Sequence, residues 1–140
     1  MDVNKWVYSV VISRGKPRNA TISYLEIVKE KNLYFHPIGT NGWPKEPPSY
    51  FGFRYDGKLQ FIREVKNTII ISEPHDYIKE IPSQIWEPCY LHYLGKTIIP
   101  KKVIKNGGIY PSGRYWCKMD ILLKANTISE AFYDSKIINE

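Results

Sequence analysis

The sequence predicts an α+β domain, made of a small curved antiparallel sheet or β-barrel with two or three peripheral helices. Two observations predict this class. Eleven Tyr and four Trp among 140 residues favour pleated, half-buried surfaces. Five or six strand-like runs also follow one another without alternating helices, which argues against a parallel α/β sheet. The length fits one domain, which we expect to span residues 1–140.

The N-terminal third predicts a strand, a helix and a loop. Residues 5–13 are rich in aromatic and β-branched side chains, which are typical of a strand, and Gly15 and Pro17 end it. Residues 19–31 place apolar side chains loosely at helical spacing and predict a helix. Residues 33–38 form a short apolar segment whose secondary structure the sequence leaves open. The Gly and Pro of residues 39–49 predict a loop.

The clearest local pattern is a β-hairpin over residues 50–65. Two strand-like runs flank Asp56-Gly57, a dipeptide suited to a type I′ turn because both central residues must adopt positive φ. Strand alternation then puts Phe51, Phe53 and Tyr55 on one face. The other face carries Tyr50, Gly52 and Arg54.

Residues 68–123 predict mostly strands and loops. We expect a strand over 68–72, a short helix over 77–81 and another strand over 89–99. Residues 101–113 form a basic loop that contains Gly107-Gly108 and the turn Pro111-Ser112-Gly113. Residues 114–123 predict a last strand, with alternate side chains on one face: Cys117, Met119, Ile121 and Leu123.

The C-terminal residues predict a helix. Thr127 and Glu130 have the spacing of a capping box, which places a helix over residues 128–138. No internal repeat and no low-complexity tract interrupts the chain.

The composition indicates a folded, basic protein. The formal charge is +6, which permits attraction to nucleic acid or to an acidic surface, and both ends of the chain carry the surplus. Two cysteines, Cys89 and Cys117, are too few for a disulfide scaffold or a metal ribbon and indicate a reducing compartment. Neither a signal peptide nor a membrane-spanning stretch is visible, so we expect a cytoplasmic protein with no membrane partner.

Catalytic motifs are weak, and we expect binding rather than catalysis, without a metal or cofactor. Asp56, Glu64 and Lys66 superficially match a metal-dependent nuclease pattern. Eight residues of straight strand, however, separate the two carboxylates by about 26 Å. The three histidines, His36, His75 and His92, lack the helical spacing of a zinc site and read as surface or core side chains.

Aromatic and basic residues supply candidate binding groups. Trp43 lies between Gly42 and Pro44 in a polar loop, where it either stacks on a ligand or plugs the end of the sheet. Asp120 lies in an apolar run, where it either pairs with Arg54, Arg63 or Lys118 or anchors a ligand. Two basic clusters can contact phosphates: Arg14, Lys16 and Arg18 form the first, and Lys96, Lys101, Lys102 and Lys105 form the second. The candidate nucleic-acid-binding residues are Trp43, Tyr50, Arg54, Asp120, Arg14, Lys16, Lys101 and Lys102.

Residues 47–65, PPSYFGFRYDGKLQFIREV, resemble the PUA-like superfamily, especially its EVE and ASCH branches. The resemblance covers residues 7–68 in pattern, through a strand, a helix, a loop and a strand pair. It implies a small β-barrel with peripheral helices that binds RNA or DNA, in several members by holding a modified or flipped base in an aromatic pocket.

Three functions follow as hypotheses. The first is a nucleic-acid-binding module, in its sharper form a modified-base or RNA reader, in which Trp43 and Tyr50 stack and Arg54 and Asp120 contact a base. The second is a protein-interaction domain whose exposed aromatics anchor another polypeptide. The third is a small nucleotide-processing enzyme with Asp120 or Glu64 as its acid or base. The sequence leaves the choice of DNA or RNA and the oligomeric state open.

Overall fold

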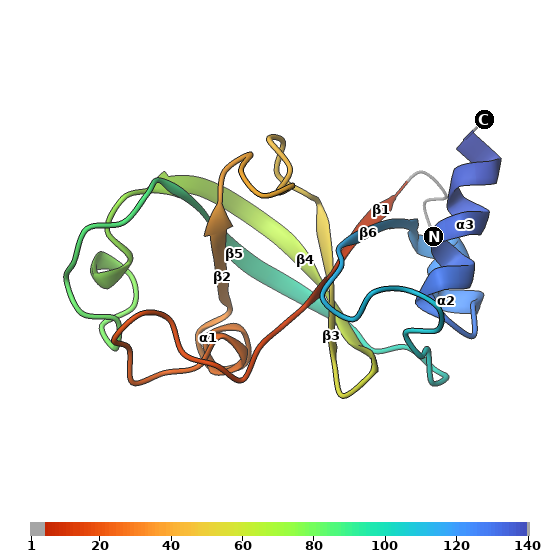
Figure 1. Cartoon of the computed structure of the whole chain (residues 1–140), viewed down its shortest axis with the longest axis horizontal. Coiled ribbons are helices and arrows are strands. Elements are labelled where there is room, and N and C mark those ends of the chain that lie inside the picture. The colour runs from red at the N-terminus through yellow and green to blue at the C-terminus, as the bar shows by residue number, and fades with distance from the viewer. Residues whose placement is uncertain (1–4, 140) are drawn as a thin grey trace. The chain divides into compact units, whose positions relative to one another are not determined.

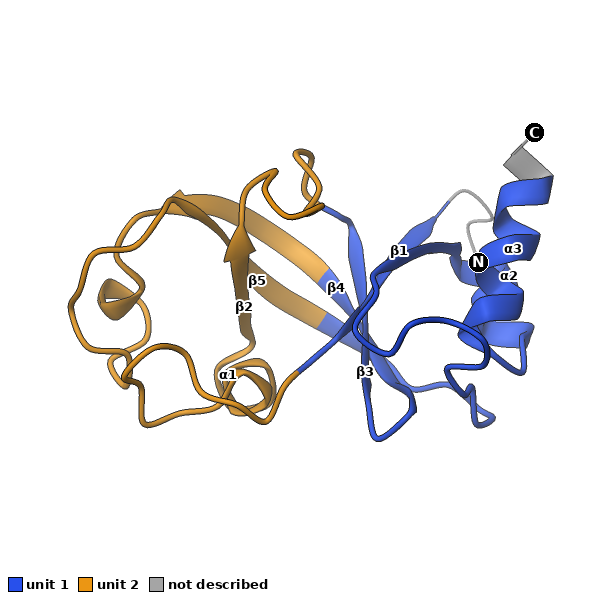
Figure 2. Ribbon diagram, in the orientation of Figure 1, with its two compact units in different colours: residues 1–12, 48–64, 96–140 blue, residues 13–47, 65–95 orange. Residues whose placement is uncertain are grey.

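The computed structural model describes residues 5–139, which divide into two compact units (Figure 2). Unit 1 comprises residues 1–12, 48–64 and 96–140, and unit 2 comprises residues 13–47 and 65–95. The expectation that the N-terminus carries no signal peptide includes residues 1–4, which lie outside the described residues. The prediction of a single domain stays a prediction.

Six strands form one mixed sheet in the order β2-β5-β4-β3-β1-β6 (Figure 1). The α+β class is therefore confirmed. β1 and β3 run parallel, so the prediction of an antiparallel sheet is wrong at this pair. The order is linear over the described strands, with β2 and β6 at its ends, and the sheet is not closed. The strands are β1 (Trp6–Val11), β2 (Leu33–Pro37), β3 (Tyr50–Tyr55), β4 (Lys58–Ile71), β5 (Cys89–Ile98) and β6 (Tyr115–Lys118).

The hairpin of β3 and β4 lies where the sequence predicts it. Asp56 and Gly57 have φ values of 56° and 77°, the positive pair that a type I′ turn requires. The register shifts between Phe53 and Arg54, because Phe53 lies opposite Phe61 whereas Arg54 lies opposite Leu59. This bulge leaves Gln60 as the extra residue of β4 and bends the strand beside Arg54.

Two helices pack beside β6 in unit 1: α2 (Met119–Lys124) and α3 (Ile128–Asn139). The α3 prediction is confirmed, since the Thr127 hydroxyl caps the helix by accepting the Glu130 backbone N–H at 3.1 Å. The prediction of a strand over 114–123 is wrong for residues 119–123. The strand β6 ends at Lys118, and the helix α2 begins at Met119. Met119 and Leu122 are buried at the i, i+3 spacing of a helix, which the alternating pattern of the sequence concealed.

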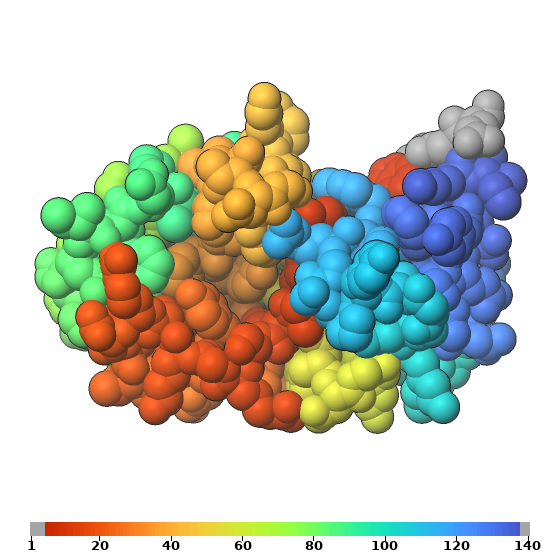
Figure 3. Space-filling model, viewed as in Figure 1, coloured from red at the N-terminus to blue at the C-terminus, as the bar shows by residue number. Residues whose placement is uncertain are grey.

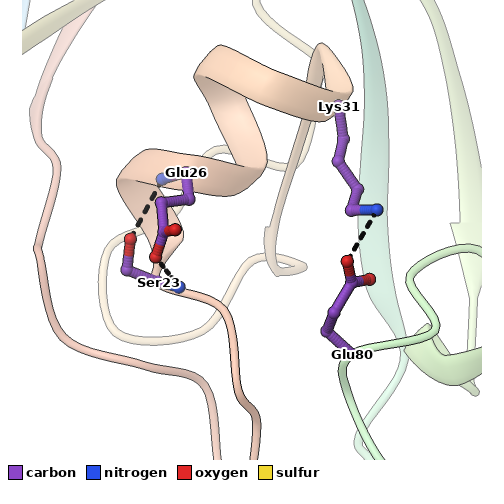
Figure 4. A network of polar contacts seen from close by, with 4 residues as sticks. All are labelled: Ser23, Glu26, Lys31 and Glu80. Carbon is purple, nitrogen blue, oxygen red and sulfur yellow. Dashed lines mark hydrogen bonds and ion pairs between the residues drawn. The ribbon is translucent and has the colours of Figure 1, made fainter.

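In unit 2, α1 (Tyr24–Lys31) begins at a complete capping box (Figure 4). The Ser23 hydroxyl accepts the Glu26 backbone N–H, and the Glu26 carboxylate accepts the Ser23 backbone N–H, each at 3.0 Å. Lys31 forms an ion pair of 2.9 Å with Glu80. The predicted helix started too early at residue 19, since Asn19 has a φ of 61° that no α-helix contains.

The structure differs from the sequence prediction at three further segments of unit 2. Residues 68–71 belong to β4 and do not form a separate strand. The short helix is a 3-10 turn over Pro74–Asp76, upstream of the predicted residues 77–81, because Pro74 suits the first helical position. Residues 33–37 form β2, whose Leu33 and Phe35 join the buried core of this unit. Among the described helices, none has the length and apolarity needed to cross a bilayer.

Candidate functional site

The loop between β5 and β6, residues 99–114, contains four Lys or Arg and no Asp or Glu. Residues 88–119 contain six Lys or Arg and no Asp or Glu. The division into units also localises the charge, since unit 1 contains twelve basic and seven acidic residues whereas unit 2 contains eight and seven. Figure 3 shows this loop, in cyan and light blue, at the surface of unit 1, and Lys101, Lys102 and Lys105 are exposed on it.

Backbone hydrogen bonds fix the first half of this loop. The Ile104 carbonyl accepts the Leu59 N–H at 2.8 Å, and the Lys105 carbonyl accepts the Ile128 N–H at 2.8 Å. Gly107 has a φ of 72°, and a Cβ there would lie 2.7 Å from the Thr127 Cβ. Glycine is therefore required for the chain to pass so close to the start of α3.

The second half of the loop carries an exposed aromatic side chain. Tyr110 is 79% exposed. Its backbone N–H donates to the Tyr115 hydroxyl at 3.1 Å, and its carbonyl accepts the Gly113 N–H at 2.9 Å. A tyrosine ring is thus presented to solvent on the same loop as three exposed lysines, an arrangement that sequence analysis had not singled out.

Arg54 lies beneath this second half and is only 1% exposed. Its Nη2 donates to the Gly113 carbonyl, and its Cζ lies 5.6 Å from the centre of the Tyr115 ring. Nε and Nη1 have no hydrogen-bond partner, and no carboxylate in the described part of the chain pairs with this guanidinium. Burial lowers the pKa of Arg54, as expected for a cation removed from water.

Ser9 is a second buried polar residue on the same face of the sheet. Its side chain is fully buried, and its Oγ has no hydrogen-bond partner. Ser9 on β1 lies opposite Gly52 on β3 and Tyr115 on β6, and the next residue but one on β3 is Arg54. Alternation along β3 and β1 therefore places the Ser9 hydroxyl and the Arg54 side chain on one face. Sequence reasoning missed Ser9, because the parallel pairing of β1 with β3 has no local signal.

The other predicted residues of unit 1 lie in different surroundings. Tyr50 is 8% exposed in the core, where the Lys5 Nζ lies 5.4 Å from its ring centre. Asp120 lies in the first turn of α2, half-buried, and its Oδ1 has no hydrogen-bond partner. It does not pair with Arg54, contrary to one of the alternatives for this carboxylate. Lys101 and Lys102 are exposed, and Lys102 donates to the Asn126 side-chain oxygen at 3.0 Å.

Arg14, Lys16 and Trp43 belong to unit 2. Arg14 and Lys16 are exposed after β1. Trp43 is half-buried and stacks on His36, with ring centres 4.2 Å apart and planes 10° from parallel. A role in nucleic-acid binding stays a prediction for all eight candidate residues.

His36 and His92, which the sequence left as unrelated side chains, form a buried pair in unit 2. Their Nε2 atoms lie 2.7 Å apart, so one donates and the other accepts. His36 Nδ1 lies 2.8 Å from the Pro37 carbonyl, and His92 Nδ1 lies 2.9 Å from the Thr68 hydroxyl. Burial and the neighbouring His36 lower the pKa of His92 to about 3.

The carbonyl at one end sets the direction of this chain of hydrogen bonds. Pro37 can only accept, so His36 Nδ1 carries a hydrogen. When His36 is neutral, its Nε2 accepts from His92, and the Thr68 hydroxyl then donates to His92 Nδ1. When His36 is protonated, His92 adopts its other tautomer and donates to Thr68. All four ring nitrogens have hydrogen-bond partners in both states. If both imidazoles were protonated, the two Nε2 atoms would each carry a hydrogen and neither could accept.

No group of three or more His, Cys, Asp or Glu in the described part of the chain could hold a metal ion. Comparison with models of protein families, with curated proteins and with solved structures gave no match for this chain.

Proposed function

We propose that unit 1 binds nucleic acid through the loop of residues 99–114. The observation that carries this proposal is a surface loop with exposed lysines, an exposed tyrosine and no carboxylate. Lysine ammonium groups attract the phosphate backbone and release its counterions, and an aromatic ring stacks on an unpaired base of any sequence.

The loop suits a single strand. Its exposed aromatic Tyr110 can contact a base only where that base is unstacked, as in single-stranded DNA or in RNA loops and ends. The PUA-like resemblance, and with it a modified-base or RNA reader, belongs to this proposal. So does a cytoplasmic location, in which the free thiols Cys89 and Cys117 stay reduced.

The test compares two charge-reversed variants that have the same net charge. The double variant Lys101→Glu, Lys102→Glu changes the loop, whereas Lys66→Glu, Lys79→Glu changes two exposed lysines of unit 2. Fluorescence anisotropy with single-stranded DNA and RNA oligonucleotides at 50–200 mM salt gives the affinity. We expect the loop variant to lose affinity by about tenfold or more and to lower the salt slope by roughly 0.7 for each lost phosphate contact. The unit 2 variant keeps both values.

Tyr110→Ala separates stacking from charge. Loss of one base–aromatic stack costs about 1–3 kcal/mol of binding free energy and leaves the salt slope unchanged. If the unmodified protein binds neither DNA nor RNA at 50 mM salt, the proposal fails and the protein-interaction hypothesis takes its place.

A further inference from the structure

Arg54 is a buried cation without a counter-ion, and this fact needs a physical explanation. Removing a guanidinium from water is costly unless an anion and hydrogen bonds compensate for the lost hydration. The Gly113 carbonyl and the Tyr115 ring offer only partial compensation. The neighbouring Cys117 cannot serve, because burial raises the pKa of its thiol to about 12 and the sulfur stays neutral.

We propose that Arg54 and Ser9 bind a phosphate group that enters beneath residues 109–114. This inference rests on the proposed function of unit 1 and names the part of the nucleic acid that the buried site would take. Arg54 and Ser9 are both fully buried, lie on one face of the sheet and have polar atoms without partners. Two such groups on one face match an anion that accepts hydrogen bonds from both.

The free donors of Arg54 have the pattern that phosphate requires. One Nη2 hydrogen is used by Gly113, so four of the five N–H groups remain. The remaining Nη2 hydrogen lies beside either Nε–H or an Nη1 hydrogen. In both cases two parallel donors are left, which is the fork that binds two phosphate oxygens. The Ser9 hydroxyl can donate to a third oxygen.

The burial of the site selects the kind of phosphate. An internal phosphodiester continues into sugar on both sides and could not be enclosed around an arginine that is 1% exposed. A terminal phosphate is attached on one side only and carries a charge of about −1.5 to −2 at pH 7. The site therefore fits a phosphate monoester, either at the end of a strand or on a free nucleotide.

Few backbone hydrogen bonds hold the cover over the site, although Ile109 packs against the core of unit 1 and the Arg114 side chain is hydrogen-bonded to Tyr8. Residues 104–106 are anchored by backbone hydrogen bonds to the hairpin and to α3. In residues 109–113, the Gly113 N–H donates to the Tyr110 carbonyl, and the Tyr110 N–H donates to the Tyr115 hydroxyl. The Arg54 side chain donates to the Gly113 carbonyl. Opening of residues 109–113 would break the hydrogen bond between Arg54 and the Gly113 carbonyl while a phosphate enters. This bond can form again afterwards, because the phosphate binds the remaining donors of Arg54 as charge-assisted hydrogen bonds.

The test uses three variants of the full chain. Arg54→Met removes the charge, Ser9→Ala removes only a hydroxyl, and Lys124→Met removes an exposed charge of unit 1 as the control. Thermal unfolding is followed with and without inorganic phosphate or adenosine monophosphate. Affinity is measured for one oligonucleotide with a 5′-phosphate, a 3′-phosphate or two hydroxyl ends.

We expect phosphate to raise the unfolding midpoint of the unmodified protein and of Lys124→Met. Both should prefer a phosphorylated end by about tenfold or more, the value of a charge-assisted hydrogen-bond pair. Arg54→Met should lose the phosphate response and the end preference while keeping an unchanged or higher midpoint without ligand, because it removes an uncompensated buried charge. Ser9→Ala should fold normally and lose part of the preference.

Different results overturn this inference and the proposed function. Equal affinity for phosphorylated and hydroxyl ends, with the loss caused by Lys101→Glu, Lys102→Glu intact, rejects the phosphate site and keeps the loop as the binding surface. A phosphate response that Arg54→Met removes, without oligonucleotide binding, keeps the site for free phosphates and rejects nucleic-acid binding. A lower midpoint in Arg54→Met with no phosphate response in any protein makes Arg54 a structural residue.

Discussion

Two buried polar sites, one in each unit, differ in how completely their polar atoms are hydrogen-bonded. In unit 2, Thr68, His92 and His36 form a chain that ends at a backbone carbonyl, and every ring nitrogen has a partner. In unit 1, Arg54 and Ser9 are buried to the same extent, yet three of their polar atoms have none. A network that is complete without a ligand stabilises the fold, whereas an incomplete one on a buried face indicates that a ligand completes it.

The surroundings of the two sites also differ: aromatic rings surround the imidazole pair, whereas unit 1 is positively charged. The imidazole pair lies among aromatic rings, with Trp43 stacked on His36 and Tyr34 stacked near His92. The surplus positive charge of the chain lies almost entirely in unit 1. Substitutions in the imidazole pair should therefore change stability, and substitutions around Arg54 should change binding.

The largest effect on stability is expected from His92→Ala. This variant leaves His36 Nε2 and the Thr68 hydroxyl without their partner and removes a buried ring. We expect the free energy of unfolding to fall by about 2–4 kcal/mol, measured by urea denaturation.

His92→Gln is the matched comparison. Its amide supplies one donor for His36 and one acceptor for Thr68, which are the roles that neutral His92 fills. It should therefore lose less stability than His92→Ala. Equal losses in the two variants would mean that packing, and not the hydrogen-bond chain, holds this part of unit 2 together.

A smaller effect is expected from pH. The pKa of His92 is about 3 in the folded protein and near 6.5 in the unfolded chain. Between these values the unfolded state binds the extra proton, so stability is complete above pH 6.5 and falls as the pH is lowered towards 3. The slope is at most about 1.4 kcal/mol per pH unit for this one group.

Urea denaturation at pH 7, 6 and 5 measures this slope, and His92→Gln isolates it. The variant keeps every other titratable group and should show a flatter profile than the unmodified protein. Parallel profiles would show that His92 does not titrate differently in the folded and unfolded states.

The sequence predicts the turns and helix ends that depend only on residues close together in the chain. The Asp56-Gly57 turn and the cap at Thr127 follow from backbone conformations that few residue types satisfy. The helix α2 was missed because Met119, Ile121 and Leu123 alternate as in a strand, although Met119 and Leu122 are the pair that the helix buries.

The buried sites depend on strand pairings that the sequence does not reveal. His36 meets His92 because β2 pairs with β5 in a register that sets Tyr34 opposite His92 and His36 opposite Tyr90. Ser9 shares a face with Arg54 because β1 pairs with β3 in parallel. Arg54 itself was predicted from its place on the hairpin face, but its burial and its lack of a counter-ion required the structure.

One titration tests the contrast between the two units most directly. In ¹H–¹⁵N spectra of the full chain, the Arg54 Nε–H signal, assigned with Arg54→Met, reports on unit 1, and the Trp43 indole N–H signal, assigned with Trp43→Phe, reports on unit 2. Addition of a 5′-phosphorylated oligonucleotide should shift the Arg54 signal strongly and leave the Trp43 signal in place. An unmoved Arg54 signal under conditions in which the oligonucleotide binds, or equal shifts of both signals, would contradict the account.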